Sequence, residues 1–509
     1  MNTDNTNTYK TNIKYQNILI IINYLFLLLM LIYRMGPTIA DVDIWHEMAL
    51  ARKAIEIGYV PYHDLFSYTK TIYPSVHHEF GAGVIAYIVT FILGGDGIVI
   101  LRYTLVASII LILLYALKRK RSNPYIVLFI LPLPILFFAF GTSAVRAHMY
   151  SFVFTTILLL FIDIDQQGKR WWIFVWLLIF TAWVNIHGGF LVGIGLAMIY
   201  GIEQCIRRRQ YKHIVWLIAA MAIIIVINPY GIHYYPYILN AVMMDRPNIS
   251  EWNSLLNSGD IMIVVLFIVL LSLTLYVVIY NNFNNIEGIF LLLATAVVSI
   301  KANRLLPFFS ICWIYMMPKW LENTPLGVAI INLYKKKAPV LLAIFTASAV
   351  FFAVKIVQIA PWNLQIPNSN RPEWGKHIIY PVGAVEYLRS HGVTGNLLVP
   401  YNYGAFVLWK LHPNVKVSLD NRYEVAYPAE VFDEQFKLYM GTENWRELLQ
   451  KYNPDIILTR TVLPLSRKIH LLSDWSLVYY DDNWEIFSKN SINLPLVIGP
   501  NGYYSGTIN

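Results

Sequence analysis

The chain has 509 residues, of which 57% are hydrophobic and only 14% are charged, and its mean hydropathy is +0.51. Soluble domains carry about 25% charged residues, so the composition excludes an ordinary soluble enzyme and indicates a chain that lies largely in lipid. The formal net charge of +9 does not require a nucleic-acid partner, because the cytoplasmic loops of membrane proteins collect Lys and Arg.

Residues 17–358 are expected to form a bundle of membrane-spanning helices. Residues 1–16 are polar and are expected to be a disordered cytoplasmic N-terminus, and the apolar run that follows is interpreted as a retained anchor. About eleven apolar runs suit spans. They are residues 17–34, 98–117, 124–140, 147–162, 171–185, 189–206, 213–228, 261–281, 286–300, 304–318 and 338–358. The run at 80–93 is short for a span and is expected to be a buried or interfacial helix.

The basic clusters decide the orientation. They are residues 118–121, 169–170, 207–212 and 335–337. All of them lie on the cytoplasmic side if the N-terminus is inside and 80–93 does not span, as the positive-inside rule requires. The outer loop 35–80, the turn at 228–260 and the tail after 359 then face outward, in a multi-pass protein of the plasma membrane.

Residues 359–509 differ in character and are expected to form an extracytoplasmic α/β domain. Short apolar runs alternate there with helical patterns. The expected strands are 396–401, 415–420, 455–459, 475–480 and 483–489, with the last two paired as a hairpin, and the expected helices are 382–391, 428–439 and 443–451.

The outer loop carries two carboxylates, Asp41 and Asp43, just outside the first span. This spacing suits a general base or a metal ligand, although the motif is short and common. Apolar residues then recur with helical spacing from Ile44 to Ile55, which predicts a short amphipathic helix at the membrane surface. Asp43 precedes this helix, and a capping role is the structural alternative for that residue.

A second polar group, which includes His78 and Glu79, stands before the run 80–93. Such a group can bind a divalent metal or can simply satisfy the polar mouth of an interfacial helix.

Further polar residues occur at the outward ends of the spans. They are Arg146, His148, Asn185, His187, Glu251, Lys301 and Arg304. Lys301 and Arg304 taken singly are explained by snorkelling, but that explanation does not predict a collection of cations and amides facing a loop rich in carboxylates. Such a collection suits a phosphate-bearing lipid substrate.

Several of these motifs together resemble a family of polytopic prokaryotic membrane proteins of the GT-C class of glycosyltransferases. The resemblance covers roughly residues 36–490. Its motifs are Asp41-Val-Asp-Ile-Trp-His, Gly58-Tyr-Val-Pro-Tyr-His-Asp-Leu-Phe-Ser-Tyr, His78-Glu79, Trp183-Val-Asn-Ile-His-Gly-Gly-Phe, Asn228-Pro-Tyr-Gly, Ile249-Ser-Glu-Trp, Asn303-Arg304, Tyr403-Gly-Ala-Phe-Val-Leu-Trp and Val417-Ser-Leu-Asp-Asn-Arg422. The run Arg146-Ala-His148 departs from the family's more common pattern, which leaves the acceptor open.

The resemblance implies a mostly α, GT-C-like fold and an inverting sugar transferase. Its donor would be a polyprenyl-phosphate-linked sugar and its acceptor a glycan, a lipid or a protein. Asp41 or Asp43 would act as base. His46, Glu79, Arg146, His148, Asn185, His187, Lys301 and Arg304 would bind the donor phosphate or the substrate. Some members of the class use a divalent ion, such as Mg²⁺ or Mn²⁺, and others use none, so the candidate metal ligands are Asp41, Asp43 and His78, with no cofactor assigned.

Two other functions stay open from the sequence. A transporter or lipid flippase would need polar groups near the bilayer midplane, whereas here they lie at the outward ends. A non-catalytic assembly protein for surface polymers could keep the same fold.

Overall fold

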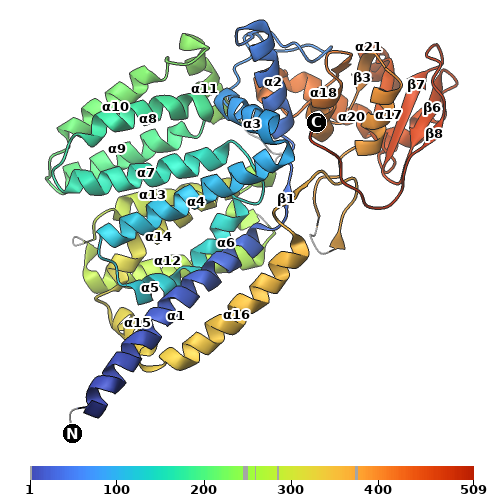
Figure 1. Cartoon of the computed structure of the whole chain (residues 1–509). Coiled ribbons are helices and arrows are strands. Elements are labelled where there is room, and N and C mark those ends of the chain that lie inside the picture. Colours follow the sequence, from blue (N-terminus) through green and yellow to red (C-terminus); the bar gives the residue numbers. More distant parts are fainter. Residues whose placement is uncertain (1–2, 245–249, 258, 284–285, 373–375) are drawn as a thin grey trace.

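The computed structural model describes residues 3–244, 250–257, 259–283, 286–372 and 376–509. It consists of a helical bundle with a smaller α/β domain at one end (Figure 1). Ile249, which belongs to one of the sequence motifs, lies outside the described residues, as does part of the turn 228–260.

Most of the bundle consists of apolar helices. They are α1 (Thr3–Met35), α3 (Phe80–Leu93), α4 (Gly95–Arg119), α5 (Pro124–Ile130), α6 (Pro132–Phe140), α7 (His148–Gln166), α8 (Trp172–Ile186), α9 (Phe190–Ile206), α10 (Lys212–Ile224), α11 (Tyr234–Met243), α12 (Ile261–Asn281), α13 (Ile289–Lys301), α14 (Leu306–Leu321), α15 (Pro325–Lys336) and α16 (Ala338–Ile359). Within the described residues, five helices have the length and hydropathy to cross a membrane, namely α1, α4, α7, α12 and α16, and α3, α8, α9, α10 and α13 are shorter apolar helices.

The expectation of a mainly helical membrane protein is confirmed, whereas the count of about eleven spans stays a prediction. The expected span 124–140 is divided into α5 and α6 at Pro132. Proline lacks the backbone N–H of a helix interior and disfavours the helical conformation of the residue before it, so it often ends a helix. Helix α1 begins at Thr3, inside the segment that the sequence predicts to be disordered.

The helix predicted in the outer loop is present as α2 (Ile44–Ile57), but it does not lie on the membrane surface with its apolar stripe toward lipid. That stripe packs on protein, between α3 and α18 (Tyr401–Leu411) of the C-terminal domain. Trp45 is fully buried there, with its ring 5.1 Å from that of Phe406. The amphipathic pattern was interpreted correctly as a helix, but the partner of the apolar face was wrong, because the hydrophobic effect does not distinguish lipid from another protein surface.

The C-terminal domain is built on a six-stranded mixed sheet with strand order β4-β3-β5-β7-β6-β8. The strands are β3 (Gly395–Leu398), β4 (Val415–Val417), β5 (Ile456–Arg460), β6 (Trp475–Tyr480), β7 (Trp484–Lys489) and β8 (Val497–Ile498). Its other helices are α17 (Val382–Ser390), α19 (Tyr423–Ala426), α20 (Ala429–Tyr439), α21 (Trp445–Tyr452) and α22 (Pro464–Ile469). The expected hairpin is confirmed, since β6 and β7 pair antiparallel.

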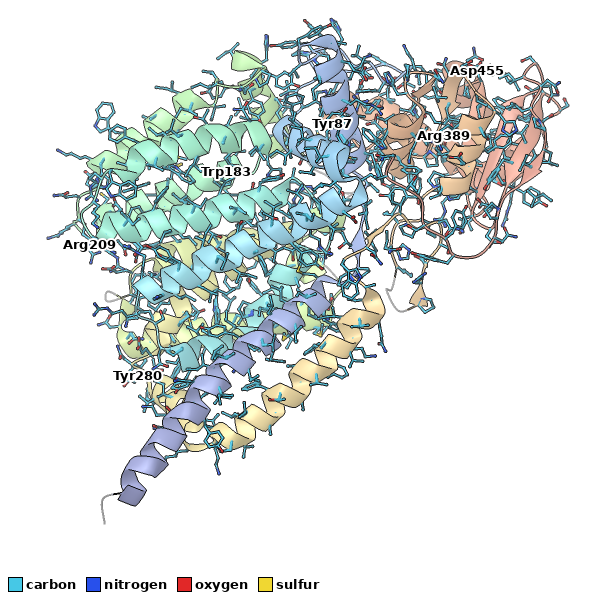
Figure 2. All side chains as sticks on the ribbon, in the orientation of Figure 1. Tyr87, Trp183, Arg209, Tyr280, Arg389 and Asp455 are labelled. Carbon is cyan, nitrogen blue, oxygen red and sulfur yellow. The ribbon has the colours of Figure 1, made fainter. Side chains whose placement is uncertain are left out.

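The bundle and the C-terminal domain are joined at more than one place. Strand β1 (Thr38–Ile39), directly after α1, pairs in parallel with β2 (Leu364–Gln365), directly after α16. In Figure 2, Arg389 and Asp455 mark the C-terminal domain, and Arg209 lies at the far end of the bundle. The basic cluster around Arg209 is therefore on the opposite side of the bundle from that domain.

Candidate active site

A cavity of about 980 Å³ lies where the outer loop, the helix ends of the bundle and the C-terminal domain meet. It gathers most of the residues that the sequence singled out. Those lining it are Asp43, His46, His78, Glu79, Arg146, His148, His187, Glu251 and Arg304. The C-terminal domain contributes a further wall, formed in part by Tyr401, Asn402, Tyr403, Arg422 and Tyr423.

The guanidinium of Arg146, in the loop between α6 and α7, is the centre of a charged cluster. Its Nε lies 3.2 Å from Asp41 Oδ1 and one terminal nitrogen lies 2.6 Å from Asp43 Oδ2. Its other terminal nitrogen is paired with the Glu251 carboxylate. Three carboxylates thus converge on one fixed cation, and the planar fork of arginine suits such a multidentate arrangement.

The two loop aspartates have different surroundings. Asp43 lines the cavity, but its side chain does not cap α2, so the capping alternative is wrong for this residue. Asp41 is not among the lining residues, and its Oδ1 accepts the backbone N–H of Asp43 at 3.1 Å. Burial, only partly offset by the charge of Arg146, raises the pKa of Asp41 to about 7. Asp41 therefore orients the backbone that presents Asp43.

Glu79, directly before α3, also lines the cavity and is approached by two histidines. His78 Nε2 is 3.5 Å and His187 Nε2 is 3.4 Å from Glu79 Oε1. The backbone N–H of Gly189 donates to His187 Nδ1 at 2.9 Å, so that nitrogen carries no proton and the Nε2–H is directed at Glu79. The Ser151 hydroxyl also contacts Nδ1, at 2.7 Å, which fixes the ring.

One residue close to Glu79 is missing from the site residues predicted from the sequence. Glu47 is charged and lies in the predicted amphipathic helix, yet only 5% of its surface is exposed. Helix α3 crosses α2 so closely that a side-chain carbon at Gly83 would collide with the backbone carbonyl of Glu47. Burial, reinforced by the Glu79 carboxylate, raises the pKa of Glu47 well above its usual range. Only its position directly after His46 could have indicated a functional role.

The Arg304 cation and the His148 imidazole line the cavity together with an apolar wall. The Arg304 guanidinium lies 4.5 Å from the ring centroid of Trp252, a cation–π contact, and among the described residues it makes no ion pair. His148 Nε2 donates to the carbonyl of Gly141 at 2.8 Å. The apolar wall beside them consists of Leu191, Val192, Ile238, Ala241, Val242 and Phe308.

Besides Asp41, two predicted site residues do not line the cavity. Lys301 is exposed at the end of α13, in keeping with the snorkelling interpretation. The Asn185 amide donates to the carbonyls of Thr181 and Ile227, at 2.8 Å each, and so ties α8 to the turn after α10.

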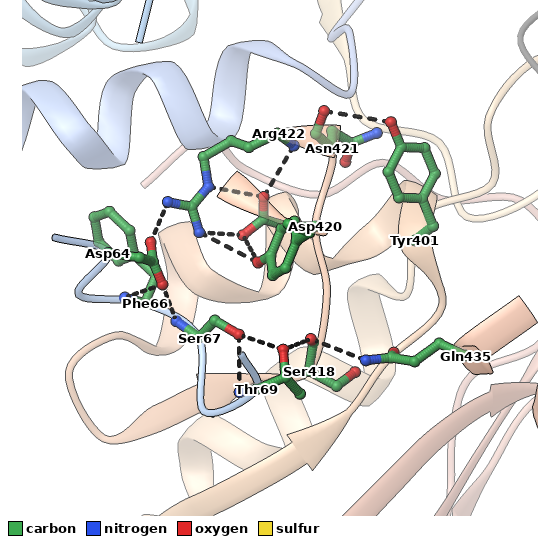
Figure 3. A network of polar contacts seen from close by, with 11 residues as sticks. Asp64, Phe66, Ser67, Thr69, Tyr401, Ser418, Asp420, Asn421, Arg422 and Gln435 are labelled. Carbon is green, nitrogen blue, oxygen red and sulfur yellow. Dashed lines mark hydrogen bonds and ion pairs between the residues drawn. The ribbon is translucent and has the colours of Figure 1, made fainter. Parts of the chain in front are cut away.

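A buried network joins the outer loop to the C-terminal domain at the edge of the cavity (Figure 3). Arg422 Nε lies 2.8 Å from Asp420 Oδ1, its terminal nitrogen lies 2.6 Å from Asp420 Oδ2, and its other terminal nitrogen is paired with Asp64. The Tyr427 hydroxyl donates to Asp420 at 2.8 Å. Burial alone would raise the pKa of Asp420, but the Arg422 guanidinium outweighs it and lowers that pKa. Two of the sequence motifs, one containing Asp64 and one ending at Arg422, therefore meet in space.

Comparison with solved structures identifies the fold. The archaeal oligosaccharyltransferase of Archaeoglobus fulgidus in the apo form matches with a TM-score of 0.52 and 10% identity, over 95% of this chain and 75% of the other. The same organism's AglB, solved with an inhibitory peptide and a dolichol-phosphate, matches with a TM-score of 0.50 and 11% identity, over 88% and 69%. No protein-family model matches the sequence, and no curated protein matches it. The chain therefore has the GT-C fold that its sequence motifs imply.

Proposed function

We propose that this protein is an inverting membrane glycosyltransferase that moves a sugar from a polyprenyl-phosphate-linked donor to an acceptor at the outer face of the plasma membrane. The observation that carries the proposal is one cavity, at the end of a GT-C bundle, that is lined by the Asp43 carboxylate, by an apolar wall and by the Arg304 guanidinium, which makes no ion pair among the described residues. A structural neighbour with this fold was solved with a dolichol-phosphate.

Asp43 is the proposed base. A general base must reach the hydroxyl proton that it removes, and of the two loop aspartates Asp43 is the one that faces the cavity. The Arg146 guanidinium fixes the orientation of the Asp43 carboxylate, while Asp41 holds the backbone. The proton of the acceptor hydroxyl goes to Asp43, the acceptor oxygen bonds to the anomeric carbon, and the bond from that carbon to the phosphate oxygen breaks.

The leaving phosphate is stabilised by fixed cations. It departs as a stable anion, so charge stabilisation matters more than protonation. Arg304 is the proposed phosphate ligand, since its guanidinium faces the cavity without a carboxylate partner among the described residues, and His148 lies beside it. The polyprenyl chain would lie along the apolar wall of α9, α11 and α14.

The direct test is transfer by purified protein. A panel of radiolabelled polyprenyl-phosphate hexoses and pentoses is offered with membrane glycans, lipids and peptides as acceptors, and the anomeric configuration of the product is read by NMR. We expect transfer with inversion from at least one donor. Correctly folded protein that releases no polyprenyl phosphate from any donor would favour the non-catalytic assembly role instead.

Replacement of Arg304 by Ala should weaken donor binding. A hydrogen bond to a charged group contributes about 1.5–3 kcal/mol, so KM for the donor is expected to rise about tenfold or more. Arg304→Lys keeps the charge and should recover part of the loss, and Lys301→Ala, an exposed cation outside the cavity, is the matched control. An unchanged donor KM in Arg304→Ala would remove this residue from the phosphate site.

The orientation is proposed from charge. With the N-terminus inside, the basic clusters lie in the cytoplasm and the C-terminal domain lies outside, which agrees with the separation of Arg209 from that domain (Figure 2). An alkaline phosphatase fusion after residue 365 should be active, and a cytoplasmic reporter at the same site should be silent. The opposite pattern would reverse the topology and place the cavity on the cytoplasmic side.

A further inference from the structure

The Arg146 guanidinium pairs with Asp41, Asp43 and Glu251, and it does not pair with the buried carboxylate of Glu47. The carboxylate is 5% exposed and lies beside the Glu79 carboxylate, yet among the described residues it forms no ion pair with a cation. A buried carboxylate is costly unless it is paired, protonated or bound to a metal. Either a shared proton or a bound cation therefore lies between Glu47 and Glu79.

A third residue, His46, favours a bound metal ion over a shared proton. His46 is 8% exposed, and its Nδ1 is buried with no hydrogen-bond partner among the described residues. One ring nitrogen of His46 and one carboxylate oxygen from each of Glu47 and Glu79 all lie within 4.8 Å of one another. An unsatisfied buried imidazole beside two carboxylates is a set of metal ligands without a structural explanation of its own.

We propose that His46, Glu47 and Glu79 form a binding site for one divalent transition-metal ion of the Mn²⁺ or Zn²⁺ type. Two carboxylates and a neutral imidazole carry a net charge of −2, which such an ion neutralises. The imidazole favours these ions over Mg²⁺, which prefers oxygen ligands alone. All three residues line the cavity, so the ion keeps open positions on that side.

The surroundings of the three ligands fit this assignment. His78 and His187 approach Glu79 Oε1 at 3.5 and 3.4 Å, as outer groups that orient a metal-binding carboxylate. The aspartates Asp41 and Asp43, by contrast, already share the guanidinium of Arg146. The aspartates thus have a built-in cation in Arg146, whereas the group of His46, Glu47 and Glu79, which begins one helical turn after Asp43, has none among the described residues.

The inference does not depend on sugar transfer, because binding of the metal is measured directly. Untagged full-length protein in detergent is freed of metal with EDTA and titrated with Mn²⁺, and the free ion is followed by electron paramagnetic resonance. We expect one tightly bound Mn²⁺ per chain, competition by Zn²⁺, and a higher thermal midpoint with metal. Glu47→Gln and Glu79→Gln should each weaken binding at least tenfold.

One further variant and the wild-type titration decide between this site and its alternatives. Asp43→Asn should keep the bound ion, and its loss there would move the metal to the aspartates and overturn the proposal. If Glu47 and Glu79 only share a proton, the wild-type protein binds no Mn²⁺ and its thermal midpoint does not respond to metal, which also overturns it. Glu47→Gln relieves the repulsion between the carboxylates, so this variant is expected to fold without metal and its weaker binding is interpretable.

Discussion

Replacement of Asp43 by Asn is expected to lower the rate of sugar transfer by about 10²–10⁴-fold, the usual contribution of a general base. Asparagine has nearly the same size and can still accept from Arg146, so the cavity keeps its shape while the basic oxygen is lost. The measurement is kcat with a saturating labelled donor. The thermal midpoint should change little, because the charge on Arg146 is still balanced by Asp41 and Glu251.

The matched variant is Asp41→Asn, which makes the same chemical change two residues earlier in the chain, outside the cavity lining. Asp41 touches the backbone N–H of Asp43 and the Arg146 guanidinium, so it is expected to act through position and to cause a smaller loss. The pH profile separates the two roles. Since the pKa of Asp41 is raised to about 7, this carboxyl becomes neutral as the pH falls through 7, and the slope that this causes should disappear in Asp41→Asn. A larger loss for Asp41→Asn than for Asp43→Asn would make Asp41 the base, and normal transfer by both variants would contradict the catalytic interpretation of the motif.

Local patterns in the sequence predicted the elements of this protein well. Three kinds of element depend on the spacing of apolar residues and on turn residues, which act over short stretches of the chain. They are the apolar helices, the helix after Asp43 and the hairpin of β6 and β7. The break at Pro132 was missed although the residue is visible, because a single proline inside a long apolar run does not always end a helix.

The sequence predicted which residues belong to the site, but it did not predict how they pair with one another. The sequence indicated Asp43, Arg146 and Arg304 as candidate site residues. It could not show that Arg146 pairs with three carboxylates, whereas Arg304 makes no ion pair among the described residues. Such contacts depend on packing between distant segments. Glu47 was missed for the same reason, since its burial arises from the close crossing of α2 and α3 at Gly83.

Replacement of Arg422 by Met is expected to cause the largest loss of stability. Arg422, Asp420 and Asp64 have side chains that are 1%, 0% and 1% exposed, and removal of Arg422 leaves two buried carboxylates without their cation. Breaking a buried ion pair in this way costs about 3–5 kcal/mol. Because Asp64 belongs to the outer loop and Asp420 to the C-terminal domain, the loss should fall on the joint between them (Figure 3).

The measurement for Arg422→Met is the thermal midpoint in detergent, together with the rate of protease cleavage in the loop 58–79. We expect a lower midpoint and faster cleavage of that loop. Adding Asp64→Asn and Asp420→Asn should restore part of the stability, because the uncompensated charge and not the missing volume is the main cost. Arg389→Met, which loses only an exposed pair with Glu386, is the control and should leave both readouts unchanged. If Arg422→Met behaves like this control, the network does not hold the loop to the C-terminal domain, and the packing of Trp45 against Phe406 has to account for the joint.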